Sequence, residues 1–236
     1  MSKLLLLSNS TMPGTPFFTW AKAHVKQFLG GIEGKGLFIP FAAVTFSFDE
    51  YEQIVKEAFA GIGFELSSFH QLSDKRRVVE EASFIVVGGG NSFALLSRMY
   101  EFDLLDLVKK KIEKGTPYVG WSAGANLSCP TIKTTNDMPI VQPTALDALN
   151  LVPFQINPHY HELKFEGQGG ETRRDRLEEF LVLNSDKRVV GLPEGMLLER
   201  QGNKLTLKGN GEAKIYEANK EIQAIKAEAD VSFLLA

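Results

Sequence analysis

Short apolar runs recur through the first three quarters of the chain. They are Leu4–Leu7, Leu37–Pro40, Phe84–Val87 and Tyr118–Val119. None of them shows the alternation of apolar and polar positions that a half-exposed strand requires. Strands of a parallel sheet have this composition when helices cover both faces, because neither face then meets water. We therefore expect these runs to form buried, parallel strands.

Segments with helical spacing and recognisable ends separate these runs. Ser47-Phe48-Asp49-Glu50 has the form of a capping box ahead of an amphipathic stretch. Leu104 to Ile112 predicts a second helix, and Glu171 to Leu183 predicts a third. The alternation of strand and helix predicts an α/β fold with a doubly wound, mostly parallel sheet.

The pattern changes at about Met196. Gly202-Asn203 and Gly209-Asn210-Gly211 separate short segments such as Leu205–Leu207 and Ala213–Tyr216. Glycine-rich turns between short apolar segments indicate antiparallel strands near the C-terminus. Because the sequence shows no repeat and no linker, we expect residues 1–236 to form a single domain.

Composition and charge narrow the class of protein. Hydrophobic residues make up 44% and charged residues 23% of the 236 residues, as in ordinary globular domains. The net charge is −3 and the basic residues are scattered, so we expect no nucleic-acid partner. Lys109-Lys110-Lys111, the densest basic cluster, continues a helical pattern and is expected to be a solvated helix face.

The apolar run at the N-terminus is short. Leu4–Leu7 is too short for the core of a signal peptide or for a membrane span. We therefore expect no membrane partner and a cytoplasmic location. Cys129 is the only cysteine, which excludes an intramolecular disulfide and a cysteine metal cluster. It lies away from any glycine-bounded turn, so we expect a buried structural thiol.

A nucleophile motif follows the run Tyr118–Val119. Gly120-Trp121-Ser122-Ala123-Gly124 matches the pattern G-x-S-x-G directly after a predicted strand. A serine on a sharp strand-to-helix turn projects its hydroxyl at the carboxyl edge of the sheet, and small flanking residues let strand and helix approach closely. The backbone N–H of Ala123 could then stabilise an oxyanion.

A glycine cluster follows another predicted strand. Gly88, Gly89 and Gly90 come directly after Phe84–Val87 and could present free backbone N–H groups. A phosphate-binding or dinucleotide-binding loop is the competing interpretation, but neither glycine pattern of those loops is met. The cluster fits a second donor of an oxyanion hole better.

A serine nucleophile needs a base, and the chain has four histidines. His24 lies in a helical stretch and His70 in a short segment, and both are expected to be surface or core residues. His159 and His161 follow Pro158 in a loop-like stretch, which is a good position for a base. The residues alone do not show which of these two histidines is the base.

Two acids are candidates for the group that orients the base. Asp137 lies in a polar loop between the serine and the histidines. Glu194 follows Val189–Pro193, at the carboxyl end of a predicted strand, where the sites of open α/β sheets gather. For each acid, an ordinary turn or cap carboxylate is an equally good interpretation.

Three arginines open the predicted helix Glu171–Leu183. Arg173, Arg174 and Arg176 oppose the helix dipole there, so their placement needs an explanation. Pairing with neighbouring acids is the favoured explanation on the residues alone. The alternative is that one arginine binds a substrate carboxylate with its planar fork.

Seven segments between residue 4 and about residue 195 together resemble the peptidase E family, the α-aspartyl dipeptidases of serine peptidase family S51. They are Leu4–Thr11, Phe38–Ala42, Gly88–Asn91, Gly120–Asn126, Thr134–Ile140, Gln155–His159 and Gly191–Gly195. The resemblance implies a fold like that of the class I glutamine amidotransferases, with serine in place of their cysteine. It also implies hydrolysis of dipeptides, and some longer peptides, that begin with aspartate.

The resemblance assigns roles residue by residue. It implies that Ser122 is the nucleophile and that His159, not His161, is the base. Asp137 matches an acid regarded as essential, and Glu194 matches the acid proposed as the third triad member. Arg173 matches the arginine proposed to bind the side chain of the substrate aspartate. In the mechanism this implies, the oxyanion rests on backbone N–H groups of Ala123 and of the turn formed by Gly88, Gly89 and Gly90.

The implied chemistry runs through an acyl-enzyme on Ser122 and requires no metal and no organic cofactor. The expected partner is a small peptide with N-terminal aspartate. The sequence leaves the oligomeric state open, with a homodimer as one option. It also leaves open which acid orients His159, the length limit on substrates and the physiological source of the peptides.

Three other functions compete with this one. An esterase of the α/β-hydrolase fold shares the order serine, acid, histidine, but its histidine usually lies near the C-terminus, whereas Ser122 and His159 are close in the chain. A cyanophycinase-like peptidase, acting on aspartyl polymers, is the closer alternative. A non-enzymatic binding module would keep its function in Ser122→Ala.

Overall fold

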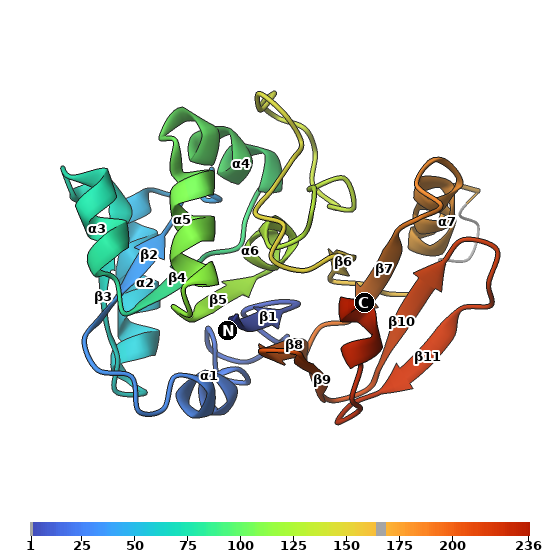
Figure 1. Ribbon diagram of the computed structural model, residues 1–236, viewed down its shortest axis with the longest axis horizontal. Coiled ribbons are helices and arrows are strands. Elements are labelled where there is room, and N and C mark those ends of the chain that lie inside the picture. The colour runs from blue at the N-terminus through green and yellow to red at the C-terminus, as the bar shows by residue number, and fades with distance from the viewer. Residues whose placement is uncertain (1, 164–168) are drawn as a thin grey trace.

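Two sheets organise the chain in the computed structural model, which describes residues 2–163 and 169–236 (Figure 1). The first has the order β3-β2-β4-β5-β1-β8-β9. Its strands are β1 (Lys3–Leu7), β2 (Lys35–Ile39), β3 (Glu65–Ser68), β4 (Phe84–Val87), β5 (Tyr118–Trp121), β8 (Met196–Gln201) and β9 (Lys204–Gly209). The second has the order β11-β10-β7-β6. Its strands are β6 (Gln155–Pro158), β7 (Arg188–Leu192), β10 (Glu212–Glu217) and β11 (Gln223–Lys226).

The helices connect and cover these strands. They are α1 (Lys22–Phe28), α2 (Phe48–Ala60), α3 (Lys75–Glu81), α4 (Ser92–Glu101), α5 (Leu104–Glu113), α6 (Ala123–Leu127) and α7 (Arg173–Leu183), with the short 3-10 helices η1 (Phe69–Gln71) and η2 (Ser232–Leu235). Among the residues that the structure describes, no helix has both the length and the apolar character needed to cross a bilayer.

The first sheet confirms the predicted doubly wound, mostly parallel arrangement. Strands β3, β2, β4, β5 and β1 pair in parallel, and β8 and β9 add antiparallel strands at one end. Strand β1 is buried on both faces, as expected from its four leucines. Leu4 and Leu6 pack into the cluster that contains α4 and α5, while Leu5 and Leu7 pack into the cluster that contains α1 and α2.

Local signals place most of the helix ends. Ser47 caps α2 as predicted, because its hydroxyl accepts from the Glu50 N–H while the Glu50 carboxylate accepts from the Ser47 N–H at 2.7 Å. Helix α7 begins at Arg173 rather than at Glu171. The reason is a second capping box, in which Thr172 is the N-cap and Asp175 completes the exchange.

The second sheet differs from the prediction. The stretch Asn157–His161 is predicted to be loop-like, which holds for residues 159–161, but Asn157 and Pro158 belong to strand β6 (Gln155–Pro158). Among the described strands, β6 lies at the end of its sheet and pairs in parallel with β7, so the missing N–H of proline costs no ladder hydrogen bond. Helix α7 packs against this small sheet, at one end of the molecule in Figure 1.

Cys129 is buried, as expected for a structural thiol. Its sulfur accepts from the Ile156 N–H at 3.2 Å. Burial raises the pKa of the thiol to about 12, so it stays protonated and unreactive at neutral pH. The basic cluster Lys109-Lys110-Lys111 lies on α5, as predicted.

Candidate active site

Ser122 occupies a sharp turn between β5 and α6. Its φ of 52° and ψ of −114° are unusual for a residue with a side chain, and such strain is typical of functional turns. The turn is tight, because a Cβ on Gly124 would lie 2.2 Å from the Val87 carbonyl oxygen of neighbouring β4. The structure therefore confirms the strand–turn–helix context that the G-x-S-x-G motif requires.

His159 contacts both Ser122 and Glu194. Its Nε2 lies 2.9 Å from the Ser122 Oγ, and its Nδ1 lies 2.7 Å from the Glu194 Oε1. A carboxylate only accepts hydrogen bonds, so Glu194 favours the tautomer with the proton on Nδ1. The Nε2 lone pair then faces the serine hydroxyl, which is the arrangement a general base needs.

The pairing of β6 with β7 explains how these groups meet. His159 directly follows β6, and Glu194 comes just after β7. These strands are parallel neighbours, with Pro158 opposite Leu192, so their carboxyl ends meet at one edge of the second sheet. The side chains of His159 and Glu194 are 38% and 40% exposed, which leaves the pair accessible from solvent.

Asp137 lies in a different environment. Its Oδ2 accepts from the Ser92 N–H at 2.7 Å and from the Thr135 hydroxyl at 3.0 Å. These contacts fix the carboxylate at the N-terminus of α4, where the helix dipole favours a negative charge. Within the described residues, Asp137 makes no hydrogen bond to His159, although both line the same cavity.

The glycine turn after β4 supplies fewer candidate donors than expected. The Gly88 N–H donates to the Ile39 carbonyl at 3.3 Å, and Gly88 is not among the residues that line the cavity. The Gly88 N–H thus extends the ladder between β2 and β4 and is already engaged by a carbonyl. Gly89, Gly90 and Ala123 do line the cavity.

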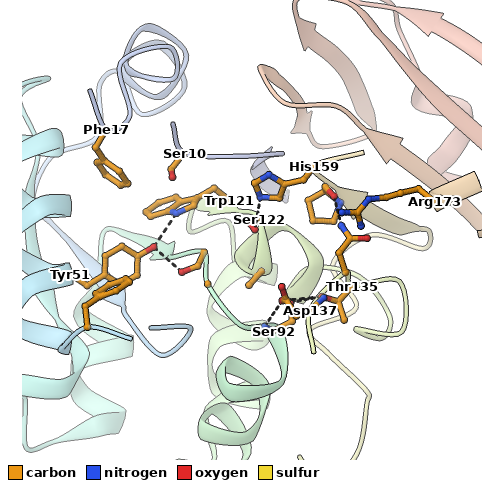
Figure 2. Close-up of a pocket in the computed structure, with 16 residues that line it drawn as sticks. Ser10, Phe17, Tyr51, Ser92, Trp121, Ser122, Thr135, Asp137, His159 and Arg173 are labelled. Carbon is orange, nitrogen blue, oxygen red and sulfur yellow. Dashed lines mark hydrogen bonds between the residues drawn. The ribbon is translucent and has the colours of Figure 1, made fainter. Parts of the chain in front are cut away.

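Tyr51, a residue of α2 that no sequence motif singled out, holds this turn through its hydroxyl. Its hydroxyl donates to the Gly89 carbonyl at 3.0 Å and accepts from the Trp121 Nε1–H at 3.1 Å (Figure 2). A trans peptide points its C=O and N–H in opposite directions, so this contact turns the Gly90 N–H away from Tyr51. Burial raises the pKa of Tyr51, which keeps its hydroxyl a donor.

Gly90 has a backbone conformation that a larger residue would not tolerate. Its φ is +137°, and a Cβ there would lie 2.2 Å from the Ala42 carbonyl oxygen. The close approach of this turn to the loop after β2 therefore requires glycine. A Cβ on Gly89 would lie 3.0 Å from the Ser122 Cβ, which places the turn directly beside the serine.

Arg173 is the first residue of α7 and lies in the wall of the same cavity, across from Trp121 and Tyr51 (Figure 2). Its neighbours behave as the ion-pair explanation predicted: Arg174 pairs with Glu178 and Arg176 with Glu171. Burial, and then the charge of Arg176, lowers the pKa of Arg173, while Asp137 opposes this shift. Arg173 therefore lines the cavity, whereas Arg174 and Arg176 form ion pairs on the surface of the helix.

The cavity around Ser122 has a volume of about 580 Å³, enough for a small peptide. The residues that line it are Ser10, Phe17, Phe46, Tyr51, Gly89, Gly90, Ser92, Trp121, Ser122, Ala123, Thr135, Asn136, Asp137, Pro158, His159 and Arg173. Segments from both sheets thus surround the serine.

Two polar residues directly after β1 bond to the segments at the carboxyl ends of β6 and β7. The buried Ser8 hydroxyl accepts from the His159 N–H and donates to the Leu192 carbonyl, both at 2.8 Å. The Asn9 Oδ1 accepts from the Gly195 N–H at 2.9 Å. The sequence offered both residues only as part of a family motif, because their partners lie more than 150 residues away.

The other histidines lie outside the cavity. His161 is exposed, and His24 lies on α1 beside Trp20. His70 contacts Asp49 at 3.0 Å and lies near Glu52, and these three could hold a metal ion as far as the described residues show. Glu52 is already paired with Lys56, and none of the three lines the cavity, so this cluster has no contact with the serine.

The fold and the site together define an α/β protein with a hydrogen-bonded serine–histidine–glutamate series of the kind found in hydrolases. The model of peptidase family S51 matches residues 4–208. The chain belongs to this family and is a peptidase.

Named relatives agree with this assignment. A protein from a Nostoc species described as peptidase E is 47% identical over 236 residues, covering 100% of this chain and 98% of the relative. A peptidase E from Shewanella denitrificans is 42% identical and covers 98% of each chain. The crystal structure of a peptidase from an acI-B1 actinobacterium, 19% identical, shares the fold with a TM-score of 0.71, covering 99% of this chain and 97% of that one.

Proposed function

We propose that this peptidase is of the serine type and hydrolyses dipeptides, and some short peptides, that begin with aspartate. The contact series from Ser122 through His159 to Glu194 is the observation that carries the proposal. It supplies a nucleophile, a base in hydrogen-bond reach and a group that holds the base in one tautomer.

In the first half-reaction, the Ser122 Oγ attacks the carbonyl carbon of the aspartyl residue while the His159 Nε2 takes its proton. The C=O electron pair moves onto the oxygen, which the N–H groups of Ala123 and Gly90 would stabilise. Glu194 stabilises the imidazolium that forms. His159 then protonates the leaving nitrogen as the C–N bond breaks, which leaves an ester on Ser122.

In the second half-reaction, water replaces the leaving amine. His159 removes a proton from the water, which attacks the ester carbonyl and forms a second oxyanion in the same place. The C–O bond to Ser122 then breaks, and the proton on His159 returns to the serine. These steps use only side chains and backbone groups of this chain, and we propose that no metal or organic cofactor takes part.

Charge complementarity supports aspartate as the N-terminal residue. An N-terminal aspartyl group carries a side-chain carboxylate and an α-ammonium group. The same side of the cavity holds Arg173, which could bind the carboxylate bidentately, and Asp137, which could pair with the ammonium. A homodimer, a cytoplasmic location and the absence of nucleic-acid or membrane partners stay predictions.

The test compares turnover of Asp-Leu, Glu-Leu, Asn-Leu and a p-nitrophenyl ester by the wild type and by Ser122→Ala. We expect Asp-Leu to be cleaved and Ser122→Ala to lower its kcat by more than about 10⁴-fold. Ser185→Ala, at an exposed serine outside the cavity, is the matched control and should retain activity. We expect Asn-Leu to react at least about 100-fold more slowly, because the amide removes a charge-assisted pair.

Each other outcome contradicts one part of the proposal. Equal turnover of Asn-Leu and Asp-Leu would refute the pairing of Arg173 with the substrate carboxylate. Cleavage of the ester without cleavage of any dipeptide would favour the esterase alternative. Full activity in Ser122→Ala would exclude a serine mechanism.

A further inference from the structure

The cavity around Ser122 has two chemically different halves. Figure 2 shows Arg173, Asp137 and Thr135 on one side of the serine, and Phe17, Tyr51 and Trp121 on the other. Of the described residues that line the cavity, the charged ones are Asp137 and Arg173, with His159 beside the serine. The opposite half consists of Phe17, Phe46, Tyr51 and Trp121 and is called the aromatic half below.

The rings of the aromatic half hold one another in place. Phe46 and Tyr51 pack edge to face with ring centres 5.1 Å apart, and Phe17 and Trp121 do so at 6.3 Å. Tyr51 and Trp121 are buried and hydrogen-bonded to each other, so the base of this half is fixed. Such edge-to-face contacts leave ring faces free for another apolar group.

The described residues cover Phe46 only in part. Its side chain is 42% exposed; it lines the cavity and also a shallow depression beside Glu50, Gln53 and Ile54 of α2. A large apolar side chain that faces a cavity beside a reacting group is typical of a binding surface, because a ligand can remove it from water.

A peptide bound for attack by Ser122 extends to both sides of the serine. Its acyl residue lies on one side of the scissile bond, and the residue that leaves lies on the other. In the proposed function, Arg173 and Asp137 bind the charged groups of the aspartyl residue. The aromatic half then lies on the side of the residue that leaves.

We propose that the aromatic half binds the side chain of the leaving residue and that the enzyme prefers apolar and aromatic side chains there. This inference rests on the proposed function. A leucine or phenylalanine side chain would cover Phe46 and Phe17 and displace water from them. A carboxylate side chain would lose water without gaining a partner, because the rings offer no positive charge. A lysine side chain can place its ammonium over a ring face, but it still gives up much of its hydration there.

The test measures kcat/KM of the wild type for Asp-Phe, Asp-Leu, Asp-Gly, Asp-Lys and Asp-Glu. We expect Asp-Phe and Asp-Leu to exceed Asp-Gly by roughly tenfold, which is the usual scale for an apolar contact in an enzyme pocket. Asp-Glu should not exceed Asp-Gly, and Asp-Lys should stay below Asp-Phe and Asp-Leu. The reversed dipeptide Phe-Asp, in which the charge and the ring change places, should not be cleaved.

Variants then locate the preference. Phe46→Ala should lower the ratio of kcat/KM for Asp-Phe to that for Asp-Gly to about one third or less of its wild-type value, and Phe17→Ala should lower it in the same direction. Val44→Ala is the matched control, because Val44 is an exposed apolar residue two positions from Phe46 that does not line the cavity. It should leave the ratio unchanged.

The outcomes separate this inference from the proposed function. Equal kcat/KM across the series, or a wild-type ratio that persists in Phe46→Ala, would overturn the assignment of the aromatic half while leaving aspartyl specificity intact. Preference for Phe-Asp over Asp-Phe would reverse the orientation of the substrate and refute both. The wild-type series needs no variant, so it decides the matter even if Phe46→Ala folds poorly.

Discussion

At the scale of single residues, the two candidate acids are distinguished by what they contact. Glu194 touches the Nδ1 of His159 at 2.7 Å, whereas Asp137 accepts from the backbone of Ser92 and from the Thr135 hydroxyl. The first contact can hold a tautomer and stabilise an imidazolium. The contacts of Asp137 with Ser92 and Thr135 instead fix the negative charge of its carboxylate near Arg173. We therefore expect the two acids to affect different kinetic constants.

Glu194→Gln should lower kcat by about 100-fold or more and change KM little, because an amide can present its NH2 group to Nδ1 and favour the wrong tautomer. Asp137→Asn should act chiefly by raising KM, because it removes the negative charge expected to face the substrate ammonium. Steady-state kinetics on Asp-Leu measures both constants. Glu178→Gln, which removes a charge from a surface ion pair with Arg174, is the control and should be close to wild type.

Near-full activity in Glu194→Gln would refute its role as the orienting group. A large fall in kcat for Asp137→Asn, with KM unchanged, would instead indicate that Asp137 acts on the chemical step. Thermal unfolding of each variant separates these effects from loss of the folded state.

At the scale of elements, the site is built where strands end and helices begin. The β5–α6 turn presents Ser122, and the glycine turn after β4 lies beside it. Helix α2 is the element that fixes the relation of these two turns, because its Tyr51 bonds to the Gly89 carbonyl of one and to the Trp121 side chain of the other. The tyrosine hydroxyl is thus expected to position the oxyanion donor of Gly90.

Tyr51→Phe keeps the ring and removes only the hydroxyl, so the aromatic surface beside the serine is retained. We expect kcat for Asp-Leu to fall about tenfold or more with little change in KM, because the Gly90 N–H is no longer held toward the developing oxyanion. Tyr100→Phe removes a hydroxyl that donates to the Asp147 carbonyl outside the cavity, and it should retain kcat. An unchanged kcat in Tyr51→Phe would show that the glycine turn keeps its shape unaided.

Sequence could predict those parts of the site that are encoded locally. The Ser122 turn, the capping box at Ser47 and the buried β1 each depend on neighbouring residues, and each was predicted. The last two residues of β6, Asn157 and Pro158, are predicted to be loop-like, because proline is unusual in a strand and the place of β6 at a sheet edge, which makes it acceptable, is not visible in the sequence. The engaged Gly88 N–H and the contacts of Tyr51 depend on distant segments, which no local pattern reports.

At the scale of the whole molecule, the site lies where the two sheets meet. The first sheet supplies Ser122, and the second supplies His159 and Glu194. Their hydrogen bonds therefore depend on how the sheets are joined. The join includes Ser8, whose hydroxyl bridges the His159 N–H and the Leu192 carbonyl, so one buried side chain links β1 to the ends of β6 and β7.

Ser8→Ala should test this dependence. It leaves the His159 N–H and the Leu192 carbonyl without their partner, and we expect the free energy of unfolding to fall by about 1–3 kcal/mol. We expect kcat to fall at least about tenfold, because His159 sits at a positive φ of 52° and needs its backbone held to keep Nε2 on the serine.

Ser128→Ala provides the comparison, since it removes another buried hydroxyl, which donates to the Ala125 carbonyl away from the cavity. Chemical denaturation should show that both variants lose stability, while only Ser8→Ala loses kcat. Equal kcat in the two variants would mean that the β6–β7 pairing alone positions the base. A selective loss in Ser8→Ala would show that the first strand of the chain, through one hydroxyl, sets the geometry of a histidine 151 residues away.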